Sequence, residues 1–156
     1  MLTSKEIKNE IIKLGYKAKD ISVREQNGGY NETFYITLKS PYINTKDIDK
    51  VVAKYQSYET DERTGEILSG GNVFIFTKFG DGVYNEVIQN HLVEANELIN
   101  KFNETTSAIR LNDKIILMKL NGCLQIRDME ECETKNIYGI EELAKCLFKI
   151  KEFGTF

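Results

Sequence analysis

The chain has 156 residues, of which 41% are hydrophobic and 29% are charged, and its net charge at pH 7 is -3. This length predicts one domain with an ordinary hydrophobic core, and the composition excludes an intrinsically disordered chain. The acidic balance provides no overall basic field of the kind that attracts a phosphate backbone, although a local basic patch can still form.

The first half begins with two marked helix starts. In residues 3–14, Thr3 is placed to cap the helix and Glu6 lies three residues later, which is the spacing of a capping box. The same pattern recurs where Asn44 precedes an apolar helical face and Asp47 follows three residues on. Both segments therefore predict amphipathic helices.

Each of these helices is followed by a predicted β-hairpin. Apolar residues alternate with polar ones in 21–23 and 34–38, around a turn at Asn27-Gly28-Gly29. The second hairpin is expected from 55–60 and 66–79, turning through 61–65. Because residues 73–76 are consecutively apolar, this last strand is predicted to be central and covered on both faces.

The second half predicts a long helix over 84–103, then strands at 108–111, 114–120 and 123–127, and a final helix over 140–153. The complete order is αββαββ followed by αβββα. This predicts an α+β fold with a largely antiparallel sheet and helices packed on one face. A single domain over 1–156 is expected, with 1–82 and 83–156 as possible subdomains.

No catalytic or metal-binding pattern is visible. The one histidine, His91, falls within a predicted helix, and the three cysteines (Cys123, Cys132 and Cys146) form no C-x-x-C pair. We therefore predict no cofactor, no metal site and no catalytic residues, so the protein is not expected to be an enzyme; the remaining alternative is an enzyme that relies on Asp, Glu, Tyr or Cys chemistry. The unpairable cysteine count favours a reducing compartment, and no secretory signal or membrane span is predicted. The expected location is the cytoplasm.

Two acidic runs and one hairpin are the candidate binding features. The runs ETDE (59–62) and DMEECE (128–133) are either solvated loops or a contact for a basic surface of another protein. The hairpin carries Arg24, Tyr30, Tyr35 and Lys39, a mixture that can stack bases and hold phosphates. However, Tyr30 and Tyr35 have opposite parity, which predicts that they lie on opposite faces of the strand.

Residues 4–79 resemble the large polyvalent protein-associated domains of phages and plasmids. The resemblance lies in the first helix, the SVR strand at 22–24, the glycine turn at 28–29, and the helix that holds Val51 and Val52 before an aromatic strand. It implies a protein of a mobile genetic element, acting in a bacterial host cell. By size and composition the chain is also similar to anti-CRISPR and antirestriction proteins, which is an analogy of type.

These observations lead to two predicted functions. The first is an inhibitor that binds a bacterial defence effector, with a CRISPR nuclease as the expected target, by stoichiometric protein–protein interaction. The alternative is a nucleic-acid-binding accessory module for phage or plasmid processing. The candidate partner-binding residues are Asp61, Glu62, Glu130, Glu131, Glu133, Tyr30 and Tyr35.

Overall fold

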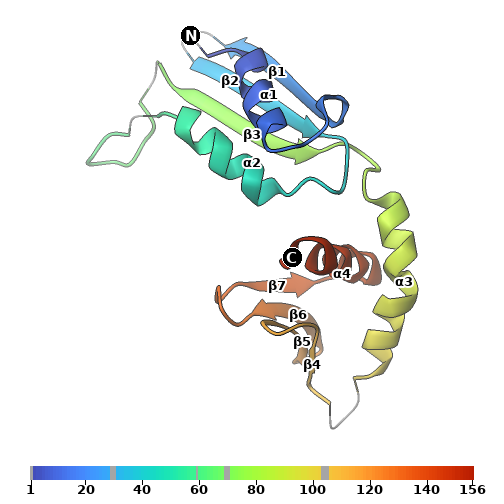
Figure 1. Ribbon diagram of the computed structural model, residues 1–156. Coiled ribbons are helices and arrows are strands. Elements are labelled where there is room, and N and C mark those ends of the chain that lie inside the picture. Colours follow the sequence, from blue (N-terminus) through green and yellow to red (C-terminus); the bar gives the residue numbers. More distant parts are fainter. Residues whose placement is uncertain (1, 29–30, 59, 69–70, 103–105) are drawn as a thin grey trace. The chain divides into compact units, whose positions relative to one another are not determined.

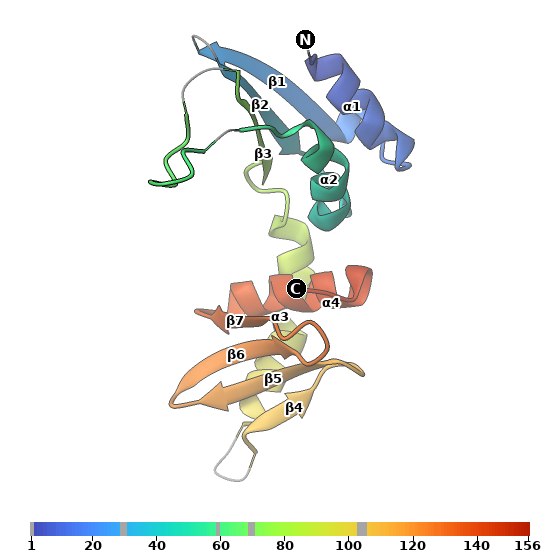
Figure 2. The same ribbon diagram turned by 90° about the vertical axis from the view of Figure 1, so that its left-hand side faces the viewer.

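The computed structural model describes residues 2–28, 31–58, 60–68, 71–102 and 106–156. The chain divides into two compact units, Met1–Val83 and Tyr84–Phe156, and each unit contains its own sheet and its own pair of helices (Figures 1 and 2). The predicted α+β class is confirmed. The strand order differs from the prediction in two places. In the first unit the strand expected at 55–60 is reduced to isolated bridges, and in the second unit the strand at Thr134–Ile137 was not predicted.

The first unit is built from two helices and three strands. They are α1 (Ser4–Lys13), β1 (Ile21–Gly28), β2 (Asn31–Leu38), α2 (Thr45–Val52) and β3 (Val73–Phe79), with short 3₁₀ turns at Ala18–Asp20 and Ala53–Tyr55. The predicted capping box is present, since Thr3 Oγ1 accepts from the backbone N–H of Glu6 at 3.2 Å and Glu6 Oε2 accepts from that of Thr3 at 2.9 Å. The side chain of Asn44 caps α2 by accepting from the backbone N–H of Lys46 at 3.1 Å.

The three strands form a sheet in the order β1-β2-β3. β1 and β2 make the predicted antiparallel hairpin, whereas β3 runs parallel to β2, with Phe34 opposite Ile75 and Tyr35 opposite Phe76. A parallel pair requires a crossover connection, and α2 lies in that connection. Of the predicted second hairpin, the described residues retain two isolated antiparallel bridges between its arms, Ser57–Val73 and Thr60–Ile67, so its first arm is not a full strand.

Both helices of the first unit cover the same face of the sheet (Figure 2). The core beneath them contains Ile7 and Ile11 of α1, Phe34, Ile36 and Leu38 of β2, and Ile48 of α2, all with no exposed surface. β3 is an edge strand with one uncovered face, so the prediction that it is central and covered on both faces was wrong. Phe76 is 53% exposed as a result.

The second unit packs two helices on a four-stranded antiparallel sheet of order β4-β5-β6-β7. Its elements are α3 (Asn85–Asn100), β4 (Ala108–Arg110), β5 (Ile115–Leu120), β6 (Cys123–Asp128), β7 (Thr134–Ile137) and α4 (Ile140–Phe153). The helices and one sheet face share a core that includes Ala95, Leu117, Ile126 and Leu143. The strand β7 was not predicted, since its short sequence TKNI contains no alternating apolar pattern.

Candidate functional site

The face of the first sheet that the helices leave uncovered brings together aromatic, basic and hydroxyl side chains. Side chains alternate across a strand, so the residues between the buried Phe34, Ile36 and Leu38 point away from the helices. The strand register then defines the members of this open face. They are Ser22, Arg24 and Gln26 of β1, Thr33, Tyr35 and Thr37 of β2, and Phe74, Phe76 and Lys78 of β3.

Two pairs of stacked aromatic rings lie on or beside this open face. The rings of Tyr35 and Phe76 have centroids 5.6 Å apart and planes inclined by 24°. At the edge, Tyr58 stacks on Phe74 with centroids 6.4 Å apart and planes inclined by 11°. Tyr35 is 38% exposed, Phe76 53% and Tyr58 57%. Exposed aromatic side chains of this kind can stack with a flat aromatic ligand.

One end of the open face is a polar hollow of about 310 Å³ (hereafter the polar hollow). Its walls carry three cations (Arg24, Lys39 and Lys78) and one carboxylate (Asp81). Within the described residues, none of these cations forms an ion pair. Because the three cations outnumber the single carboxylate, this hollow is electrostatically suited to an anion.

A second hollow of about 480 Å³ adjoins the first and contains the Tyr35 side chain (hereafter the aromatic hollow). Arg24, Thr37 and Lys78 line both hollows, so the two are contiguous. Gln26 adds an amide, which can both donate and accept hydrogen bonds, and Glu25 adds an acceptor. The pair of hollows thus places a stacking surface next to hydrogen-bonding groups and positive charge.

The structure brings together part of the predicted hairpin site. Arg24 and Lys39 line the polar hollow, Arg24 and Tyr35 line the aromatic hollow, and Tyr30 lies outside the described residues. Sequence reasoning missed Phe76 and Lys78, because their strand was expected to be buried on both faces. Lys78 shares its parity with Phe74 and Phe76, and this lysine was the signal for a solvent-facing row.

The first acidic run forms a turn in the first unit, and Glu59 lies outside the described residues. The Asp61 carboxylate accepts from the backbone N–H groups of Arg63 and Thr64, both at 2.9 Å. These bonds, that of Thr64 first, hold the pKa of Asp61 below its usual value. Asp61 therefore shapes the turn and is only half-exposed, whereas Glu62 is exposed.

The second acidic run forms a turn between β6 and β7 that is organised by a buried carboxylate. Asp128 is 1% exposed and accepts from the backbone N–H groups of Glu130 at 2.9 Å and Glu131 at 3.0 Å. Lys114 Nζ lies 3.4 Å from the same carboxylate. The hydrogen bond from Glu131 is the main cause that lowers the pKa of Asp128. The side chains of Glu130, Glu131 and Glu133 are exposed on this turn.

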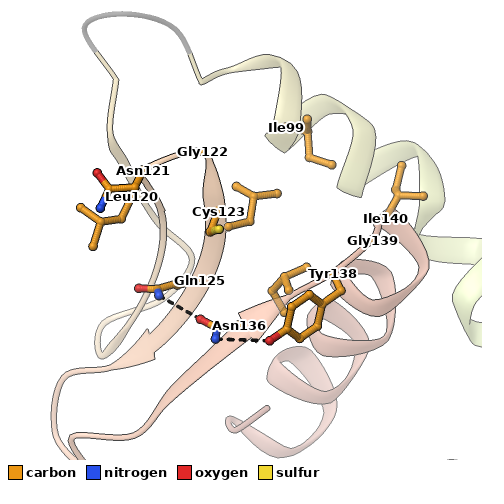
Figure 3. Close-up of a pocket in the computed structure, with 12 residues that line it drawn as sticks. Ile99, Leu120, Asn121, Gly122, Cys123, Gln125, Asn136, Tyr138, Gly139 and Ile140 are labelled. Carbon is orange, nitrogen blue, oxygen red and sulfur yellow. Dashed lines mark hydrogen bonds between the residues drawn. The ribbon is translucent and has the colours of Figure 1, made fainter.

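The second unit also contains an open, mostly apolar cleft of about 540 Å³ (Figure 3). It lies between the tip of the β5–β6 hairpin, the end of β7, the start of α4 and Ile99 of α3. Gln125 donates to Asn136 Oδ1 at 2.9 Å, and Asn136 donates to the Tyr138 hydroxyl at 3.5 Å, so these polar groups satisfy one another. The cleft therefore presents apolar surface with few polar groups available to a ligand.

The histidine and the cysteines do not assemble a reactive centre. His91 Nδ1 lies 2.8 Å from the carbonyl of Val87 on its own helix, and its ring packs edge-on against Phe148. Burial raises the pKa of the Cys146 thiol, which lies 3.6 Å from Lys135 Nζ, while Cys123 and Cys132 are exposed. Among the described residues, no three His, Cys, Asp or Glu side chains gather so as to hold a metal ion.

Comparisons with protein-family models, with curated proteins and with solved structures gave no match to this chain. The resemblance of residues 4–79 to mobile-element domains therefore stays a prediction. In the part of the chain that the structure describes, no helix is both long enough and apolar enough to cross a membrane.

Proposed function

We propose that the first unit binds single-stranded nucleic acid on the open face of its sheet. The observation that carries this proposal is the exposed, stacked pair Tyr35 and Phe76 with Arg24 and Lys78 beside it, two cations that form no ion pair with the described residues. Any of the bases can stack on an aromatic side chain, and neighbouring cationic side chains bind the backbone phosphates. Duplex bases are already stacked on one another, so a single strand is the expected ligand.

The charge distribution supports the same assignment. Residues 1–83 contain twelve basic and twelve acidic side chains, so the first unit is neutral and the whole excess of negative charge lies in residues 84–156. The low pI of the chain is therefore no obstacle to phosphate binding by the first unit. The screening length at physiological ionic strength is about 8 Å, so a phosphate at the open face is attracted mainly by the cations close to it.

The test is a fluorescence anisotropy titration with labelled, unphosphorylated oligonucleotides of about 12 nucleotides, as single strands and as a duplex of the same sequence. We expect the single strand to bind more tightly. If Arg24 and Lys78 each contact one phosphate, the logarithm of the affinity should fall with the logarithm of salt concentration with a slope of about -1.4.

A matched pair of charge variants sharpens this test. Lys78→Gln should reduce the salt slope by about 0.7, because one phosphate contact is lost. Lys50→Gln serves as the control, since Lys50 is an exposed lysine of the same unit on α2, which packs on the opposite sheet face. If no strand binds at low salt, or if both variants behave alike, the open face is not a nucleic-acid site.

As a second candidate we propose that the second unit binds a basic protein surface and so inhibits a bacterial defence effector such as a CRISPR nuclease. The specific observation is the turn fixed by Asp128, which presents the exposed Glu130, Glu131 and Glu133 on a unit with excess negative charge. A nuclease must carry a basic groove for its substrate, and an acidic turn is complementary to such a groove.

This second candidate is tested with a purified CRISPR nuclease and a molar excess of the protein. Inhibition should be stoichiometric, and the charge reversal Glu130→Lys with Glu131→Lys should slow association. Glu97→Lys, at an exposed position of α3, is the control for a general change of charge. Unimpaired cleavage at large excess across effector types would remove the inhibitor hypothesis.

A further inference from the structure

The polar hollow carries more positive charge than one internal phosphate would neutralise. Arg24, Lys39 and Lys78 outnumber the one carboxylate, Asp81, which leaves an excess of two positive charges. An internal phosphodiester carries one negative charge, whereas a terminal phosphate monoester carries close to two at pH 7. The hydroxyl groups of Ser22 and Thr37 also line the hollow and can donate hydrogen bonds to phosphate oxygens.

The turn that follows β3 lines one end of the polar hollow through Gly80 and Asp81. The backbone N–H of Gly80 donates to the carbonyl of Leu38 at 2.8 Å, which ties this turn to the end of β2. A side chain added at Gly80 would lie 3.7 Å from the methyl group of Thr37, so the turn packs directly beside the hollow. Gly80 and Asp81 line the polar hollow but not the aromatic hollow, so this turn lies at the end of the polar hollow away from Tyr35.

The separation of the two hollows is similar to the separation of the base and the phosphate within one nucleotide. Tyr35 and Phe76 precede Thr37 and Lys78 by two residues on adjacent parallel strands. Two residues correspond to about 6.6 Å along a strand. A base stacked on the aromatic pair can thus reach the polar hollow with the phosphate of its own nucleotide.

We propose that the polar hollow binds the terminal phosphate monoester of a nucleic-acid strand whose last base stacks on Tyr35 and Phe76. This inference rests on the proposed binding of single strands, and it adds that the protein recognises a phosphorylated strand end. Lys39 is central to it, because Lys39 lines the polar hollow and does not line the aromatic hollow.

The experiment compares single strands of one sequence that carry a 5′-phosphate, a 3′-phosphate or no terminal phosphate, with the matching nucleoside monophosphate as a competitor. One phosphorylated end should bind about tenfold more tightly than the unphosphorylated strand, because charge-assisted hydrogen bonds are added. Lys39→Gln should bring this affinity ratio towards one, while Lys50→Gln should keep it. Thermal unfolding of each variant verifies that it is folded.

The possible outcomes separate this inference from the function on which it rests. If all strands bind equally tightly, terminal-phosphate recognition is wrong and single-strand binding stands. If the monophosphate binds the protein in a direct titration but no strand binds, the hollow takes a free nucleotide and both proposals fail. A tenfold ratio that survives Lys39→Gln also refutes the assignment, because the terminal phosphate then lies elsewhere.

Discussion

Removal of one ring of the stacked pair should weaken binding of single strands without unfolding the first unit. Phe76 is 53% exposed on an edge strand, so its truncation in Phe76→Ala leaves the core beneath the helices intact. The stability cost is the lost ring pair, about 0.5–1.5 kcal/mol. The binding cost is one base–aromatic stack, about 1–3 kcal/mol, which corresponds to a loss of affinity of roughly 5- to 150-fold.

The assay pairs anisotropy titrations with urea unfolding for Tyr35→Ala, Phe76→Ala and the double variant. Because both rings contact each other and are proposed to stack with the same base, the double variant should lose less affinity than the sum of the single losses. Tyr42→Ala is the control for loss of an exposed aromatic residue, since Tyr42 is 56% exposed and lines neither hollow. Parental affinity in the folded Phe76→Ala variant would refute the stacking argument.

Three further outcomes concern stability. Phe34→Ala should destabilise the first unit by about 3–5 kcal/mol in urea unfolding, because Phe34 has no exposed surface; a small effect would contradict its place in the core. Thr3→Ala should cost about 0.5–2 kcal/mol through loss of the α1 cap, measured by the same method, and Glu6→Ala should not add fully to it because the two side chains form one box. The pKa of Asp128 lies below its usual 3.8, so its carboxylate stabilises the second unit above that pH, and the contribution is lost as pH falls through the lowered value. Asp128→Asn should therefore lower stability at pH 7 and flatten its fall below about pH 4, and an unchanged acid profile would count against this role.

Local rules were sufficient to predict many of the elements from sequence. The capping box at Thr3 and Glu6 requires only residues three apart, and it is present in the structure. The strands expected at 114–120 and 123–127 are likewise joined by Asn121 and Gly122, two residues that tolerate positive φ and are observed at 50° and 81°. The alternation of Phe34, Ile36 and Leu38 correctly assigned one strand face to the core.

The candidate site depended on tertiary structure, because its parts come from strands that are far apart in sequence. An apolar run such as residues 73–76 is compatible with a central strand or with an edge strand, and nothing within it specifies its neighbour. The fold places this strand parallel to β2 at the edge of the sheet, and that pairing sets Phe76 against Tyr35 and Lys78 beside Thr37. Sequence determined which residues alternate along each strand, and the packing of the helices on a single face decided which of them remained accessible to a ligand.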